Sequence, residues 1–392
     1  MTGRNMQTRR IAIFGATGSI GINTLDVIGQ LGGREAFEIT AVTGNANVAA
    51  LARLAIEHGA AMAVTADESR YSELKQALSG TGIRAAAGTS GLDEAADQGN
   101  DVVMAAIVGT AGLAPTLKAA AAGADIALAN KECLVSAGPL FMEAVKRGGG
   151  MLIPVDSEHS AIFQVFAENQ RRALDRVIIT ASGGPFRAMT LDEMRHVDAA
   201  TARAHPNWSM GLKISIDSAS MFNKALEMIE AQHLFDLAPE QVEVVVHPQS
   251  IIHSMVGYAD GSILAQLGSP DMRTAIGYAL SYPERRPLSV EKLDFARLAR
   301  LDFEAPDEAR FPALRLARLA MERGGLQGAV LNGAKEIALE AFIDGRCGFL
   351  EMAEITGAVM EEMRDLPAAA AIEDVFVADG EARRRAAKRV GD

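Results

Sequence analysis

Residues 10–21 read Arg-Ile-Ala-Ile-Phe-Gly-Ala-Thr-Gly-Ser-Ile-Gly, a short apolar run followed by three glycines with the spacing G-x-x-G-x-x-G. The apolar run predicts a buried strand ending at Phe14, and Thr24 to Leu31 predict the helix that follows. Glycines between a strand and a helix let backbone N–H groups approach a pyrophosphate, and the helix N-terminus favours its negative charge. A glycine-rich turn without a ligand is the alternative, but the strand–turn–helix context favours a dinucleotide site.

The rest of the first 150 residues continues this alternation of apolar strands and helices. Further strands are predicted at 37–43, 61–64, 101–108, 126–129 and 151–155, and helices at 48–58, 71–78 and 113–122. Continuous apolar strands that alternate with helices are typical of a parallel sheet covered on both faces. We therefore expect an α/β fold whose first domain is Rossmann-like.

The end of the second predicted strand should select between NAD and NADP. NAD-binding proteins usually carry Asp or Glu there to bind the ribose hydroxyls, whereas this chain has Thr43-Gly-Asn45-Ala-Asn47. The absence of an acid permits a 2′-phosphate, which favours NADP. No Lys or Arg stands in this stretch either.

The later parts of the chain predict a second α/β region and a helical end. Residues 182–211 form a long, Gly- and Pro-containing, partly periodic segment, which is typical of a mobile loop over a site. Helical patterns continue from 312 to 390 and indicate a small bundle. The predicted organisation is an N-terminal Rossmann-like NADP-binding domain (1–156), a central α/β catalytic domain (157–282) for metal and substrate, a linker (283–307) and a C-terminal helical domain (308–392).

Composition excludes several classes of function. The 392 residues include 38 basic and 50 acidic side chains, and a net charge of −12 argues against binding nucleic acid. Two cysteines cannot build a disulfide framework and fit a reducing cytoplasm. No uninterrupted apolar run is long enough for a membrane span, and the first ten residues lack the apolar core of a secretory signal.

Two carboxylates predict a divalent metal site in the central part of the chain. Asp156 and Glu158 follow the predicted strand 151–155, and an extended i, i+2 pair would point both side chains to one side. Hard cations such as Mg²⁺ bind oxygen ligands of this kind. By itself, an acidic pair of this spacing is also common on exposed turns.

Two further groups of polar residues are suited to a phosphate. Asn223, Lys224 and Glu227 share one face of a predicted helix, where an amide, an ammonium and a carboxylate can hold a phosphate and a metal together. The run Ser182-Gly-Gly-Pro185 adds a hydroxyl and flexible backbone donors. Each of these groups and the carboxylate pair is a weak signal alone, but the occurrence of all three after a nucleotide-binding fold favours a functional site.

A set of motifs, taken together, resembles the 1-deoxy-D-xylulose 5-phosphate reductoisomerase family over the whole chain. The motifs occur in the order Gly15-Ala-Thr-Gly-Ser-Ile-Gly21, Ala129-Asn-Lys-Glu132, Val155-Asp-Ser-Glu-His-Ser160, Ser182-Gly-Gly-Pro-Phe186, His205-Pro-Asn-Trp-Ser-Met-Gly211, Asn223-Lys224 with Glu227, and His247-Pro-Gln-Ser-Ile-Ile-His-Ser254. The resemblance implies an NADPH-dependent and divalent-metal-dependent enzyme. It would rearrange and reduce 1-deoxy-D-xylulose 5-phosphate, a small phosphorylated sugar, to 2-C-methyl-D-erythritol 4-phosphate.

The same resemblance implies a role for individual residues. The metal, Mg²⁺, Mn²⁺ or Co²⁺, would be held by Asp156, Glu158 and Glu227. The catalytic group would comprise Glu132, Lys224, His205, Asp156 and Glu158. The substrate would contact Lys131, Ser157, Glu158, Ser182, His205, Trp208, Ser218, Asn223, Lys224 and Glu227. The NADPH site would be lined by Thr17, Gly18, Ser19, Ile20, Asn45, Asn47, Ala106, Ile107, Asn130, Glu132, Met210 and Gly211.

One position departs from the family pattern. Many members carry a glycine–basic–asparagine triplet after the second strand, and the corresponding triplet Asn45-Ala46-Asn47 lacks the basic residue. This departure concerns the strength of the preference for NADP over NAD, and not the reaction.

Two alternatives stay open, a metal-independent NADP reductase of the semialdehyde or homoserine dehydrogenase type, which would not need Asp156, Glu158 and Glu227, and a non-catalytic NADP-sensing regulator. The resemblance also implies a homodimer, and the cysteine usage favours a cytoplasmic location.

Overall fold

The computed structural model describes residues 8–202 and 211–391, which form two compact units. The first unit comprises the described residues up to Asn130 together with 141–160 and 271–291. The second comprises 131–140, 161–270 and the residues from 292 onward, apart from the gap at 203–210. Two of the five crossings between the units lie inside helices, α6 (Glu132–Gly148) and α7 (Ser157–Val165).

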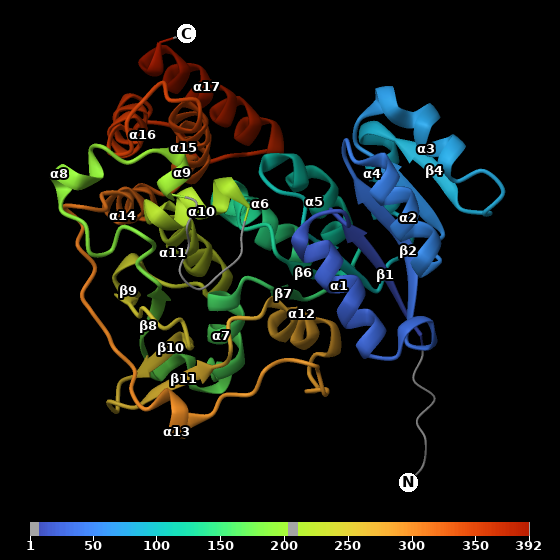
Figure 1. Ribbon diagram of the computed structural model, residues 1–392, viewed down its shortest axis with the longest axis horizontal. Helices are drawn as coiled ribbons and strands as arrows, with labels where there is room; N and C mark the ends of the chain where they lie inside the picture. Colours follow the sequence, from blue (N-terminus) through green and yellow to red (C-terminus); the bar gives the residue numbers. More distant parts are fainter. Residues whose placement is uncertain (1–7, 203–210, 392) are drawn as a thin grey trace. The chain divides into compact units, whose positions relative to one another are not determined.

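The first unit is built on a seven-stranded parallel sheet (Figure 1). Its strands are β1 (Arg9–Phe14), β2 (Phe37–Gly44), β3 (Met62–Thr65), β4 (Arg84–Ala87), β5 (Val102–Ala105), β6 (Asp125–Leu128) and β7 (Leu152–Pro154), in the order β4-β3-β2-β1-β5-β6-β7. The order reverses between β1 and β5, and ligands of open parallel sheets bind at such a reversal, beyond the carboxyl ends of the strands.

Helices complete the first unit. They are α1 (Ser19–Gln30), α2 (Val48–His58), α3 (Tyr71–Ala77), α4 (Gly88–Ala96), α5 (Leu113–Ala121) and α12 (Met272–Ser281). Helix α12 packs against α1, although the two are about 250 residues apart, so residues 271–291 belong to this unit. The α/β class with a Rossmann-like first part is confirmed. The predicted domain boundaries stay a prediction.

The second unit contains a mixed sheet and most of the remaining helices. Its strands β8 (Leu174–Ala181), β9 (Val242–Val246), β10 (Ile252–Tyr258) and β11 (Ile263–Leu267) lie in the order β11-β10-β8-β9. The pair β8–β9 is parallel, whereas β10 pairs antiparallel with both β8 and β11. The helices are α8 (Leu191–Met194), α9 (Ala199–Ala202), α10 (Leu212–Ala219), α11 (Phe222–Phe235), α13 (Phe295–Leu298), α14 (Ala313–Arg323), α15 (Gln327–Ile343), α16 (Glu351–Glu362) and α17 (Ile372–Val390).

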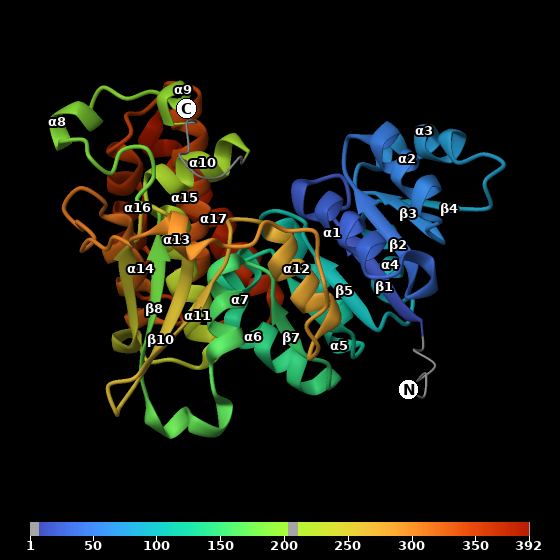
Figure 2. The ribbon, with the colours of Figure 1, turned by 60° about the horizontal axis from the view of Figure 1, so that its bottom comes forward.

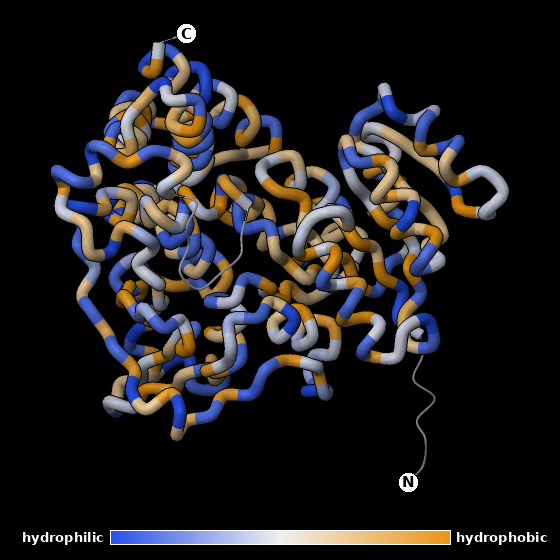
Figure 3. The backbone as a smooth tube through the Cα atoms, viewed as in Figure 1, coloured by the Kyte–Doolittle hydropathy of each residue, from blue (hydrophilic) through white to orange (hydrophobic). Residues whose placement is uncertain are grey.

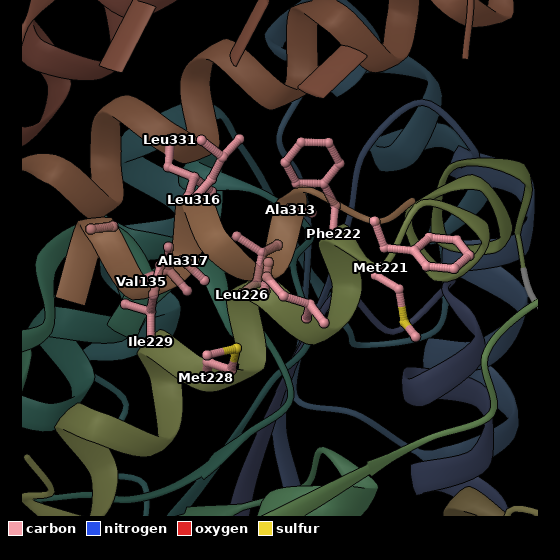
Figure 4. Packing of buried hydrophobic residues seen from close by; sticks show 14 of the residues in the cluster. Val135, Met221, Phe222, Leu226, Met228, Ile229, Ala313, Leu316, Ala317 and Leu331 are labelled. Atoms are coloured by element: carbon pink, nitrogen blue, oxygen red, sulfur yellow. The ribbon is translucent and has the colours of Figure 1, made fainter. Parts of the chain in front are cut away.

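The four C-terminal helices, α14 to α17, cluster together, which confirms the predicted helical end of the chain (Figures 1 and 2). Polar and apolar residues alternate along them (Figure 3). Their apolar sides share one core with β8 and α11. In that core Leu226 and Ile229 of α11 lie among Leu316 and Ala317 of α14 and Leu331 of α15 (Figure 4). Helix α11 is therefore held on a rigid apolar base while its first turn carries the polar residues.

Helix α11 also carries a histidine whose burial should make stability depend on pH. A Cβ placed on Gly138 of α6 would lie 2.3 Å from the ring of His233, so the ring is packed directly on the α6 backbone. Burial lowers the pKa of His233 from 6.5 to about 4. Above about pH 6.5 the ring is neutral in both the folded and the unfolded chain, so this group then imposes no stability cost.

We expect stability to fall as the pH drops from about 6.5 to about 4, because the unfolded chain then takes up a proton that the folded chain excludes. This shift in the pKa of His233 corresponds to a loss of at most ~3 kcal/mol in the free energy of unfolding. Urea unfolding at pH 7 and pH 4.5 should show a smaller loss in His233→Gln than in the unchanged protein. The exposed His196→Gln is the matched control. Equal losses in all three proteins would remove His233 as a cause.

Candidate active site

The glycine-rich turn after β1 is shaped for close approach of the backbone. Gly15 has φ +85°, and a Cβ at this position would lie 2.5 Å from the carbonyl oxygen of Ala106 after β5. A Cβ at Gly21 would lie 2.5 Å from the carbonyl oxygen of Gly15. Helix α1 begins directly after Gly18, which offers no side chain to cap the first-turn N–H groups. These donors and the helix dipole are suited to a pyrophosphate.

The neighbouring turn after β5 is held by a buried asparagine. Asn130 donates hydrogen bonds from Nδ2 to the carbonyl oxygens of Ile107 and Gly109, the latter at 2.9 Å. Its Oδ1 is buried and has no hydrogen-bond partner among the described residues. A buried acceptor beside the strand-order reversal fits an amide donor such as that of a nicotinamide.

The end of β2 completes the nucleotide side of the site. A Cβ at Gly44 would lie 3.3 Å from the Thr17 side chain, so Thr17 faces this end of the strand. Thr65 Oγ1 donates to the carbonyl oxygen of Asn45 (2.8 Å), and Asn47 Oδ1 caps α2 by accepting from the backbone N–H of Ala50 (3.1 Å). The first unit thus brings together Thr17, Gly18, Ser19, Ile20, Asn45, Asn47, Ala106, Ile107 and Asn130.

The carboxylates Asp156 and Glu158 follow β7 in the first unit. Asp156 Oδ1 accepts from the backbone N–H of Glu158 (3.1 Å) and lies 3.0 Å from Nδ1 of the fully buried His159. Ser157 Oγ donates to Glu158 Oε2 (2.7 Å). The predicted extended geometry of this pair is wrong, because α7 begins at Ser157 and Glu158 lies in its first turn.

In the second unit, a buried carboxylate is surrounded by cations. Glu227 is fully buried in α11, and its Oε1 accepts from Lys131 Nζ at 2.8 Å and from Asn223 Nδ2. Its Oε2 accepts from Lys224 Nζ. The side chains of Asn223, Lys224 and Glu227 therefore meet on one helix face, as their spacing predicts. Lys131 also donates to Asn223 Oδ1 (3.0 Å), a contact between residues 92 positions apart that residue spacing does not reveal.

Two serines lie on segments that touch one another near α11. The loop after β8 carries Ser182, whose Oγ accepts from the backbone N–H of Gly184 (3.1 Å). Gly184 has φ +64°, and a Cβ there would lie 3.0 Å from the carbonyl oxygen of Ser218 in α10. Only glycine permits this approach, which brings Ser182 and Ser218 to one part of the second unit.

Glu132 opens α6 in a buried electrostatic network. Burial raises the pKa of its carboxyl group, while the ammonium groups of Lys335 and Lys131 favour the charged form. Lys335 is buried in α15 and donates to Asp217 Oδ2 (3.0 Å) and Glu336 Oε1 (2.7 Å). Sequence patterns did not single out Lys335, since a lone lysine in a helix has no distinguishing spacing.

Some predicted site residues have no described geometry. His205, Trp208 and Met210 lie outside the described residues. Gly211, the residue before α10, is described and exposed. The described part of the predicted loop 182–211 contains the short helices α8 and α9, and its mobility stays a prediction.

Comparison with known proteins shows the same family along almost the whole chain. Residues 11–138 match the model for 1-deoxy-D-xylulose 5-phosphate reductoisomerase, and residues 152–235 and 267–385 match two C-terminal domain models of this enzyme. The enzyme of this name from Rhizobium etli is 71% identical over 388 residues, which are 99% of this chain and 98% of the relative. The chain belongs to the 1-deoxy-D-xylulose 5-phosphate reductoisomerase family.

Solved structures of reductoisomerases share the fold. The Zymomonas mobilis reductoisomerase in complex with NADPH is 51% identical, with a TM-score of 0.92 and coverage of 98% of this chain and 99% of that one. A reductoisomerase in complex with NADPH, fosmidomycin and magnesium is 41% identical, with a TM-score of 0.93 and coverage of 97% and 98%. The motifs that carried the resemblance thus belong to a family relationship that spans the chain.

Proposed function

We propose that this chain converts 1-deoxy-D-xylulose 5-phosphate to 2-C-methyl-D-erythritol 4-phosphate, with NADPH and a divalent metal, in the non-mevalonate pathway to isoprenoids. The observation that carries the proposal is 71% identity to a reductoisomerase over 99% of the chain. The geometry supports it, because one unit has a dinucleotide turn and the other has a cluster of lysines around a buried carboxylate.

The first unit binds the nucleotide. NADPH supplies the hydride when it is bound. The uncapped first-turn N–H groups of α1 would hold its pyrophosphate, and the buried Oδ1 of Asn130 would be available to accept from the nicotinamide amide. The tight packing of Gly15 on Ala106 leaves the carboxyl ends of β1 and β5 open to the cofactor rather than covered by side chains.

The metal ligands that we propose are the carboxylates of Asp156, Glu158 and Glu227. A divalent ion supplies Lewis-acid stabilisation of the substrate's carbonyl and neighbouring hydroxyl oxygens. The donor set fits, since all three residues offer carboxylate oxygens, which Mg²⁺ and Mn²⁺ prefer. Glu227 already pairs with two ammonium groups, so its position attracts positive charge. His159 contacts Asp156 and orients its carboxylate.

The substrate residues that we propose lie mainly in the second unit. Ser182, Ser218, Asn223 and Lys224 bind the phosphate or backbone hydroxyls, and the packing of Gly184 on α10 supports this grouping. Further contacts come from Ser157, Lys131 and the segment with His205 and Trp208. Glu132 helps to move a proton near the reacting centre, and burial raises the pKa of its carboxyl group.

The experiment that tests the function is NADPH oxidation with 1-deoxy-D-xylulose 5-phosphate, with and without a chelator. We expect oxidation that requires the sugar phosphate, stops with the chelator and returns with added Mg²⁺ or Mn²⁺. Oxidation that persists without metal would favour the semialdehyde or homoserine type of reductase. NADPH binding without turnover under any of these conditions would favour the sensing regulator.

Assembly and location are further proposals. We propose a homodimer, in line with the resemblance, and the exposed Ile263 and Leu264 on the edge strand β11 are suited to a subunit contact. Sedimentation of the full chain tests this proposal. Among the described residues, no helix is both long and apolar enough to cross a membrane. The cytoplasm stays the expected location.

A further inference from the structure

The group that distinguishes NADPH from NADH is a 2′-phosphate, and Rossmann-like folds place it beyond the end of the second strand. Residues 45–47 after β2 include no cation. The structure nevertheless places one there. Arg70, at the start of α3, donates from Nη1 to the carbonyl oxygen of Ala46, although the two residues are 24 positions apart.

We infer that Arg70 recognises the 2′-phosphate of NADPH in this chain, in place of the basic residue that is missing from 45–47. This inference rests on the proposed use of NADPH. An arginine near the end of β2 is a recognised partner of the 2′-phosphate. Its planar group of donors can bind two phosphate oxygens at once, which a lysine does not do.

The position of Arg70 is fixed from both sides. On its own side, Asp67 Oδ1 accepts from the backbone N–H (3.0 Å) and Oγ (2.6 Å) of Ser69, which fixes the turn before α3. On the other side, Thr65 holds the carbonyl oxygen of Asn45 and Asn47 caps α2. The cation is therefore presented at the end of β2 by two ordered turns rather than by a freely moving chain.

The guanidinium group of Arg70 has capacity to bind an anion. The side chain is 39% exposed, and its Nε lies 3.1 Å from Glu73 Oε2, a pair that is itself exposed to water. Its Nη2 has no hydrogen-bond partner among the described residues. A doubly charged phosphate can compete with a single solvated carboxylate. The next cation on α3, Lys75, lies over the Tyr71 ring at 5.8 Å instead.

The alternative role for Arg70 is a brace for the turn at Ala46 with no part in selecting the cofactor. The two roles predict different binding. A brace affects NADPH and NADH equally, because both share the adenine, the ribose and the pyrophosphate. A 2′-phosphate ligand affects NADPH alone.

Calorimetric titration of the purified full chain with NADPH and with NADH separates these roles. Arg70→Gln should raise the Kd for NADPH by about 10- to 100-fold, the usual size for a charge-assisted hydrogen-bonded pair, and leave the Kd for NADH within about twofold. Lys75→Gln, on the same helix, should leave both constants unchanged. Adding Ala46→Arg to Arg70→Gln should restore most of the NADPH affinity.

Three outcomes would overturn the inference or its basis. Equal weakening of both nucleotides in Arg70→Gln would make Arg70 a brace. An unchanged Kd for NADPH would place the 2′-phosphate elsewhere. Equal affinity of the unchanged protein for NADPH and NADH would instead contradict the proposed cofactor preference, so the two failures are distinguishable.

Discussion

Glu227→Gln should lower turnover of 1-deoxy-D-xylulose 5-phosphate by roughly a thousandfold or more while the Kd for NADPH stays within about threefold. Charge stabilisation by a bound divalent ion is worth several kcal/mol, and each ~1.4 kcal/mol is a factor of ten in rate. Glutamine keeps the volume of the side chain but removes the negative charge that Lys131 and Lys224 now share. The proposed metal site then loses a ligand and faces two ammonium groups without a counter-charge.

NADPH binding is the internal control for this variant, since the nucleotide turn belongs to the first unit and Glu227 to the second. Glu240→Gln, an exposed carboxylate just after α11, is the matched control and should retain full turnover. Asp156→Asn and Glu158→Gln should behave like Glu227→Gln. Near-normal turnover in any of the three would remove that residue from the proposed ligand set.

Lys335→Met should have the largest effect on stability, a loss of about 3–5 kcal/mol in the free energy of unfolding. Burial would lower the pKa of Lys335, but Asp217 and Glu336 raise it above its ordinary value, so the ammonium group stays charged. Removing it leaves the carboxylate of Asp217 buried without a counter-charge. Urea unfolding at neutral pH measures the loss.

A second substitution makes this prediction specific to the buried charge. In Lys335→Met with Asp217→Asn the buried carboxylate is gone, so more than half of the lost stability should return. Lys118→Met is the matched control, because the pair of Lys118 with Asp97 is exposed and should contribute less than about 1 kcal/mol. Equal losses in the two lysine variants would contradict the assigned role of Lys335.

The sequence predicted those elements whose signal is local. The glycine turn at 15–21 and the helix at 48–58 were predicted because glycine spacing and apolar periodicity are properties of the segment itself. Strand β4 and helix α4 were not predicted, since the run Arg84-Ala-Ala-Ala87 becomes a strand only by pairing with β3. Strand β10 was also missed, because its histidine and serine residues interrupt the apolar pattern.

In the candidate site, too, local contacts could be predicted from the sequence and long-range contacts could not. The face shared by Asn223, Lys224 and Glu227 follows from helical spacing, and the hydrogen bonds confirm it. The contact of Lys131 with Glu227 joins residues 96 positions apart, and that of Arg70 with Ala46 joins residues 24 apart. Such contacts depend on how the elements pack, and residue spacing along the chain contains no record of that packing.

The measurement that tests the account most directly is the carbon skeleton of the product, followed by NMR during NADPH oxidation in the presence of Mg²⁺. In the substrate, the methyl group is attached to the ketone carbon. Rearrangement followed by reduction places it on a carbon without hydrogen, so we expect one methyl proton singlet to replace another at the rate of NADPH oxidation. A methyl doublet would instead mark direct reduction to a straight-chain alcohol. That result would contradict the proposed reaction and would make the chain a simple reductase.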